Sequence, residues 1–157
     1  FTVNAQVPTL VTAENFVVFS TNGMVTFNVT NSLSTHLTLN VDTNTLGGTT
    51  AGFGNLNGMM QDDNLVSQLA PADILTAHDQ LNAIIPNYFP SAHMGNGVIL
   101  NTSVYFINSG AVINGNLILN GQGNPNALFV FQIRYAFSTN ALSEITLING
   151  AKACNVF

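Results

Sequence analysis

The side chains that could carry acid–base or nucleophilic chemistry are few and scattered. The histidines are His36, His78 and His93, and the single cysteine, Cys154, stands in the apolar context ACNVF, which is typical of a buried small hydrophobe. No His-Glu-x-x-His, Cys-x-x-Cys or Gly-x-Ser-x-Gly spacing brings such groups together. His78 is followed by Asp79 in a helical stretch, where adjacent residues do not face each other, so we expect His78 to pack at the helix edge. These residues predict neither a catalytic site nor a cofactor.

Charged groups are equally sparse. Asp62 and Asp63 could contribute to a calcium site, but an acid pair at a helix N-terminus is the commoner arrangement, so no metal site is predicted. Polysaccharide lyases and hydrolases depend on carboxylate pairs or clustered basic residues, whereas the basic residues here are only Arg134 and Lys152. The glycine-rich turn after Asn120 is followed by no Walker-type Gly-Lys-Ser, which argues against a phosphate site. The sequence therefore favours a protein that is not an enzyme.

Composition excludes several partners. Charged residues are 6% of the 157 residues, against about 25% in an ordinary domain. A net charge of −5 with two basic side chains cannot neutralise phosphates, so neither nucleic acid nor an anionic membrane surface is an expected partner. No apolar run reaches the ~18 residues of a membrane span, so no membrane insertion is expected. We expect one domain that acts as a monomer.

The first residues, FTVNAQ, carry Val3 and Ala5 at the −3 and −1 positions of a signal-peptidase cut before Gln6. One interpretation is that residues 1–5 are the remnant of a signal peptide and that the domain occupies residues 6–157. The alternative is an ordinary first strand. The first interpretation predicts a secreted, extracellular protein.

Threonine and asparagine recur at alternate positions in two segments. VTFNVT (25–30) and LTLNVD (37–42) both alternate apolar with polar residues, which is typical of strands with one buried and one solvent-facing side. The solvent-facing rows contain Thr26, Asn28, Thr30, Thr38 and Asn40.

The elements that must position these rows are mainly strands, with one helix. Apolar residues at helical spacing predict a helix over about 62–85, which Pro71 should kink or divide. An exit loop is expected over 85–97, and strand-like segments separated by Gly, Asn, Pro and Ser follow from Val98. Such short strands leave a β-sandwich or a β-solenoid open, and Asn and Gly at the corners favour the solenoid.

The segment NGQGNPNALFVFQI (120–133) joins a cluster of turn residues to an apolar run. Gly121, Gly123 and Asn124 are candidates for positive backbone dihedral angles, and Pro125 fixes another. Alternate large residues at 129, 131 and 133 predict a strand that buries aromatic rings in the interior. The segment is interpreted as a corner of the scaffold and not as a site.

Two of these segments also resemble a known family. GQGNPNALFVFQI (121–133) followed by LINGAKACNVF (147–157) is similar to the paired signature of the microbial ice-binding domain, the discontinuous β-solenoid of secreted antifreeze proteins. TAENFVVFSTNGMV (12–25) resembles the opening of that domain, so the resemblance covers about 8–157. It implies a right-handed solenoid of triangular section with the helix packed alongside, no catalytic residue and no cofactor. Family domains continue past CNVF through further coils, so the domain is expected to be incomplete at its C-terminus.

The resemblance implies adsorption to ice as the function. Ice binding requires a flat, sparsely charged face, and a solenoid provides a grid of about 6.6 by 4.8 Å. The candidate ice-binding residues are therefore Thr26, Asn28, Thr30, Thr38 and Asn40, although threonine is also ordinary on solvent-facing strands. The alternative function is an extracellular structural or adhesive module that binds glycans or matrix. An exposed aromatic platform drawn from Tyr88, Phe89 or Tyr105 would favour that alternative.

Overall fold

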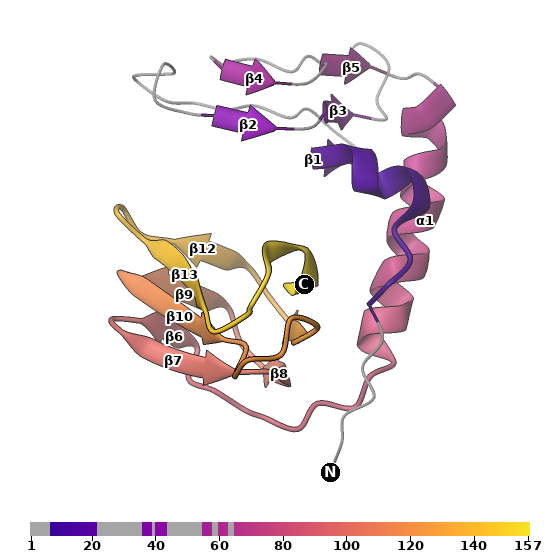
Figure 1. Ribbon diagram of the computed structural model, residues 1–157. Helices are drawn as coiled ribbons and strands as arrows, with labels where there is room; N and C mark the ends of the chain where they lie inside the picture. Colours follow the sequence, from indigo (N-terminus) through magenta and orange to yellow (C-terminus); the bar gives the residue numbers. More distant parts are fainter. Residues whose placement is uncertain (1–6, 22–35, 39, 44–54, 58–59, 63–64) are drawn as a thin grey trace. The chain divides into compact units, whose positions relative to one another are not determined.

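The short alternating segments form strands that pair in parallel. The computed structural model describes residues 7–21, 36–38, 40–43, 55–57, 60–62 and 65–157 (Figure 1). Every pairing between its named strands is parallel. The chain divides into two compact units, one over Thr9–Asp79 and one that contains Gln80–Phe157. Parallel strands need crossover connections, and the parallel pairing decides between the two sequence-based alternatives in favour of coils over a sandwich.

The unit that contains Gln80–Phe157 is a three-sided stack of coils. Its three sheets have the strand orders β12-β9-β6, β13-β10-β7 and β11-β8. Successive strands along the chain join successive sheets, so each group of three strands makes one turn of a solenoid (Figure 1). The strands are β6 (His93–Gly95), β7 (Val98–Asn101), β8 (Ser103–Ile107), β9 (Ala111–Asn114), β10 (Asn116–Asn120), β11 (Phe129–Ile133), β12 (Phe137–Thr139) and β13 (Glu144–Ile148).

Alternate residues of these strands form the core. Leu119 and Phe129 are completely buried in a cluster to which all three sheets contribute, and Phe131 packs against it. The ring of Tyr105 stacks on that of Phe131 with their centroids 4.8 Å apart. The sequence-based prediction of an aromatic core strand at 129–133 is therefore confirmed.

The unit Thr9–Asp79 contains the 3₁₀ helix η1 (Val11–Asn15) and two parallel sheets, β1-β3-β5 and β2-β4. The backbone N–H and the hydroxyl of Thr12 both donate to one carboxylate oxygen of Asp73, which fixes η1 to the helix α1 (Leu65–Asn82). The strands are β1 (Phe16–Ser20), β2 (His36–Thr38), β3 (Asn40–Thr43), β4 (Asn55–Asn57) and β5 (Met60–Asp62).

The helix α1 spans Leu65–Asn82, within the predicted 62–85. Pro71 lies inside it and does not begin a second segment. Asp62 belongs to β5 and the first turn of α1 contains no acid, so the predicted acidic N-terminus is wrong for Asp62, whereas Asp63 lies outside the described residues. His78 is also different from the prediction, because its side chain is 66% exposed and its Nδ1 lies 3.4 Å from Asp79 Oδ1. Both side chains are exposed and can rotate toward each other, although their Cβ atoms point in different directions.

Two other expectations need correction. The segment 85–97 contains the strand β6, and Tyr88 forms a β-bridge with Tyr105, so it is not only a loop. Cys154 is exposed in the 3₁₀ turn η3 (Ala153–Asn155), where the buried neighbour is instead Asn155. The side-chain amide of Asn155 donates to the carbonyl of Pro125, so the turn directs Asn155 inward and leaves Cys154 outside.

Within the described part of the chain, no helix has the length and apolar character needed to cross a membrane. In the same residues, no group of three His, Cys, Asp or Glu side chains is arranged to hold a metal ion.

Candidate functional site

The three sides of the unit Gln80–Phe157 differ in how open they are. The outer side of the β8–β11 sheet packs against the end of α1 and the residues after it, where Val104 and Val130 are 1% exposed and contact Leu81 and Ile84. Gln132 Nε2 donates to the carbonyl oxygens of both Leu81 and Ile84, at 2.8 and 2.9 Å. This coverage leaves the other two sheets as candidates for a broad binding face.

The sheet β12-β9-β6 is narrow. Met94 and Ile113 are register partners and point into the core. The next row along the strands faces outward and consists of His93, Val112 and Ser138, which pair in register. Because its strands are three or four residues long, this side presents little more than that row and the adjacent Asn114 and Asn140.

The sheet β13-β10-β7 presents the broadest regular face. Leu117 and Leu119 are buried, so the alternate residues of β10 face outward, and the flanking strands follow the same register without a bulge. In-register parallel strands place the outward side chains on a grid. We call this surface the β10 face; its residues are Ile99, Asn101, Asn116, Ile118, Asn120, Glu144, Thr146 and Ile148.

A ladder of asparagine amides borders the β10 face. Asn149 Nδ2 donates to Asn120 Oδ1 at 2.9 Å, and Asn120 Nδ2 donates to Asn101 Oδ1 at 3.2 Å. Asn120 Oδ1 also accepts a bond from the backbone N–H of Gln122 at 3.0 Å. Each amide is held by its neighbours, so the polar edge is fixed before any ligand arrives.

A second polar contact crosses the face. Thr146 Oγ1 donates to Asn116 Oδ1 at 2.9 Å and lies 3.3 Å from Glu144 Oε1. Glu144 is the one charged residue among those that define the face. The face is therefore a mixture of methyl groups and oriented amides with very little charge.

Backbone geometry at the corner keeps the coils in register. A Cβ on Gly121 would lie 2.5 Å from the nitrogen of Ala151, so only glycine permits this close stacking. Positive φ angles occur at Gln122, Gly123 and Asn149. The prediction of positive angles is thus confirmed at Gly123 and wrong at Gly121 and Asn124; Gly121 is required by the space between coils.

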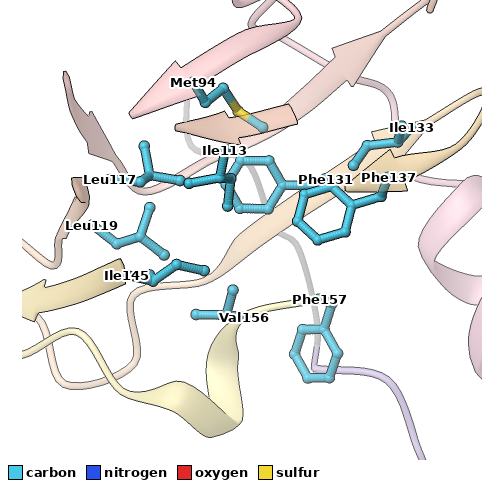
Figure 2. Close-up of a pocket in the computed structure, with 10 residues that line it drawn as sticks. All are labelled: Met94, Ile113, Leu117, Leu119, Phe131, Ile133, Phe137, Ile145, Val156 and Phe157. Carbon is cyan, nitrogen blue, oxygen red and sulfur yellow. The ribbon is translucent and has the colours of Figure 1, made fainter. Parts of the chain in front are cut away.

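The C-terminal end of the core contains an apolar cavity of about 300 Å³ (Figure 2). Figure 2 shows side chains from all three sides of the unit around it. Phe137 and Ile145 are about half exposed, so the cavity opens at the last coil. Its lining is Met94, Ile113, Leu117, Leu119, Phe131, Ile133, Phe137, Ile145, Val156 and Phe157.

Among the groups that the structure describes, Tyr105 is the one whose pKa is clearly shifted, and it lies in the core and not on a face. Burial, with a smaller contribution from the nearby Tyr88, raises the pKa of Tyr105 well above the usual range of tyrosine. Its hydroxyl donates to the carbonyl of Asn101. The neutral phenol serves packing and hydrogen bonding.

The candidates chosen from sequence lie in the other unit. Thr26, Asn28 and Thr30 are outside the described residues. Thr38 ends β2, which pairs with β4, whereas Asn40 begins β3, which pairs with β1 and β5. The expected single strand over 37–42 is therefore two strands in different sheets, and Thr38 and Asn40 do not share a row. No side-chain environment is described for either, so their role stays a prediction.

Sequence reasoning did not select the β10 face, although a signal exists. The segments VILN (98–101), LILN (117–120) and TLIN (146–149) repeat one pattern, and the asparagine of each belongs to the ladder. The repeat is short and its spacing is unequal, because the corner at 121–128 lengthens one coil.

Stacked parallel coils with one broad, nearly uncharged face define a β-solenoid. The chain belongs to the Ice-binding-like family, whose model matches residues 11–157. An ice-binding protein of Nostoc sp. (strain HG1) is 35% identical over 155 residues, which are 98% of this chain and 55% of that protein.

Solved structures are similar as well. The crystal structure of an ice-binding protein from an Antarctic bacterium of the Flavobacteriaceae superposes with a TM-score of 0.85 at 43% identity, over 96% of this chain and 34% of that one. That from the Antarctic ascomycete Antarctomyces psychrotrophicus gives 0.82 at 28% identity, over 96% and 72%. The chain thus spans about half of the Nostoc protein and a third of the bacterial one.

Proposed function

We propose that this chain adsorbs to ice and that the β10 face is part of its ice-binding surface. The observation that supports this proposal is the in-register sheet β13-β10-β7, whose outward residues form a regular grid that includes one charged residue. Membership of the Ice-binding-like family supports the activity, and the openness of this side supports the location.

The face has the properties that ordered water requires. The row Ile99, Ile118 and Thr146 supplies aliphatic groups that cannot hydrogen-bond water and so leave it to bond within its own lattice. The asparagine ladder beside this row supplies fixed donors and acceptors at the strand spacing. Because the amides are already held by one another, adsorption does not have to restrict their rotation.

A bulky residue in the outward row Ile99, Ile118 and Thr146 should prevent close approach of the ice lattice. Thr146→Tyr is expected to remove ice-crystal shaping and most thermal hysteresis, while the far-UV circular dichroism stays unchanged. Ser138→Tyr places the same ring on the narrow side and is the matched control. Equal activity of the two variants would exclude the β10 face.

The unit Thr9–Asp79 contributes the second part of the proposal. Thr26, Asn28 and Thr30 remain candidate ice-binding residues by their alternating pattern, and Thr38 and Asn40 remain candidates on two separate sheets. We also propose that the protein acts as a secreted monomer.

The cavity at the end of the core is open, and Phe137 and Ile145 remain about half exposed there. An additional coil would cover Phe137 and Ile145 and would add a further row to the β10 face. Measurement of thermal hysteresis and thermal unfolding on this chain and on a longer natural form tests this point. A longer form with neither higher stability nor higher activity would contradict it.

An extracellular module that binds glycans remains the alternative. Tyr88 and Phe89 are 51% and 68% exposed, as an aromatic platform requires, but Tyr105 is buried and cannot belong to one.

A further inference from the structure

A second concavity lies on the β8–β11 side, on a different sheet from the β10 face. It has a volume of about 290 Å³ and is lined by Asn82, Phe106, Gln132, Ile133 and Arg134. The lining residues come from the end of α1, from β8, and from β11 with the residue after it. Unlike the cavity at the end of the core, this groove combines an aromatic ring with amides and a cation.

Its aromatic wall extends beyond the groove itself. The ring of Phe106 meets that of Phe89 edge to face, with centroids 6.2 Å apart and an angle of 77° between the planes. Phe89 is among the most exposed large apolar residues of this unit. Exposed rings of this kind offer the flat apolar surface on which the C–H groups of a sugar ring stack.

The polar wall is already oriented. Both hydrogens of the Gln132 amide go to the carbonyls of Leu81 and Ile84, which fixes the group and leaves Oε1 as an acceptor for a hydroxyl. Arg134 Nη1 lies 3.5 Å from Asn108 Oδ1, and its backbone N–H is bonded to Ile107 O at 3.0 Å. Arg134 is one of only two basic residues in a chain of net charge −5. Its planar guanidinium can hold a carboxylate through two parallel bonds.

We propose that this groove binds a uronic acid residue of an acidic polysaccharide. The pyranose ring stacks on Phe106 and meets Phe89 with its edge, a ring hydroxyl donates to Gln132 Oε1, and the carboxylate pairs with Arg134. A volume at the lower end of the ~300–1,000 Å³ range of ligand sites fits one sugar unit of a polymer. A single cation is too little for a polyphosphate, and the polar wall does not suit a wholly apolar ligand.

Titration of the ¹⁵N-labelled chain with trigalacturonate, followed by NMR, tests the proposal. Saturable shifts are expected at residues 106 and 132–134, with a Kd of about 1 mM, which is ordinary for a ligand that buries one ring. Maltotriose, which has the ring but not the carboxylate, should bind at least about tenfold more weakly, since a charged hydrogen-bonded pair is lost.

Variants separate the groove from general charge attraction. Arg134→Gln and the exposed Phe89→Ala should each weaken binding about tenfold, whereas Lys152→Gln removes the same charge outside the groove and should change nothing. Phe106→Leu, which keeps the apolar volume, should also weaken binding. The ice activity of all four variants should remain, so this site and the ice-binding proposal can fail separately.

Three outcomes would overturn the inference. They are the absence of saturable shifts, equal affinity for maltotriose, and an equal loss in Lys152→Gln and Arg134→Gln.

Discussion

Asn120 is held on both sides by other asparagines, because it accepts a hydrogen bond from Asn149 at 2.9 Å and donates one to Asn101 at 3.2 Å. The bonds join three successive coils through side chains of one type. In this ladder the middle member, Asn120, must be both donor and acceptor. A carboxylate accepts only, so Asn120→Asp removes the donor that reaches Asn101.

Asn120→Asp should therefore destabilise the protein at neutral pH. The variant loses the bond to Asn101 and places a charge beside the side-chain carbonyl oxygen of Asn101. The free energy of unfolding should therefore fall by about 1–3 kcal/mol. Protonation of the new acid restores a donor, so the loss should shrink as pH falls below ~4. Urea unfolding at two pH values measures this, with the loop change Asn126→Asp as the control. Equal stability of the two variants would contradict the role of the ladder.

The corner glycines should differ in the reason for their sensitivity. Gly121→Ala places a methyl 2.5 Å from the Ala151 nitrogen, so backbone must move and the loss should be about 1–3 kcal/mol. Gly123 has open space around its Cα and a φ of +82°, so Gly123→Asn should be tolerated, because asparagine adopts that conformation. Gly121→Asn should be at least as harmful as Gly121→Ala. Thermal unfolding distinguishes these cases.

Two phenylalanines report on the closed and open parts of the core. Phe129 is completely buried, so Phe129→Ala should cost about 3–5 kcal/mol. Phe137 lines the open end and is 53% exposed, so Phe137→Ala should cost less than half as much. Guanidinium unfolding compares them, and similar losses would show that the end of the core is covered in solution.

Tyr105 predicts an alkaline loss of stability. Burial raises its folded-state pKa above the unfolded value of about 10, so the fold favours the neutral phenol. The resulting stabilisation is complete below pH ~10 and falls as pH rises from there toward the folded-state pKa, because only the unfolded chain ionises. Tyr105→Phe should remove this dependence while losing the bond to the Asn101 carbonyl. Tyr135→Phe, at an exposed ring, is the control in urea unfolding between pH 8 and 11.

The threonines of the other unit require a separate test. Thr26→Lys combined with Thr38→Lys should abolish ice-crystal shaping without unfolding, if their rows take part in adsorption, because a long hydrated cation prevents close contact. Unchanged crystal habit would remove both residues from the site.

The sequence predicts the regular parts of the fold better than the site. Alternation at 129–133 is enough to predict a buried aromatic strand, and helical spacing finds α1 to within three residues at each end. Cys154 and Asn155 show the limit: composition favours a buried thiol, but a 3₁₀ turn buries the amide because it can donate to Pro125. Likewise, only the stacking register shows that Asn101, Asn120 and Asn149 meet, since they are 19 and 29 residues apart.

The open end of the coil stack makes the binding surface extensible. Each additional turn of this geometry would add one strand to the sheet β13-β10-β7 and one row to its outer grid, without altering the rows already present. The translational freedom lost on adsorption is lost once, whereas the rows contribute additively to the free energy. Affinity for a flat crystal should therefore rise geometrically with the number of turns, so solenoid length alone could set how strongly a member of this family adheres.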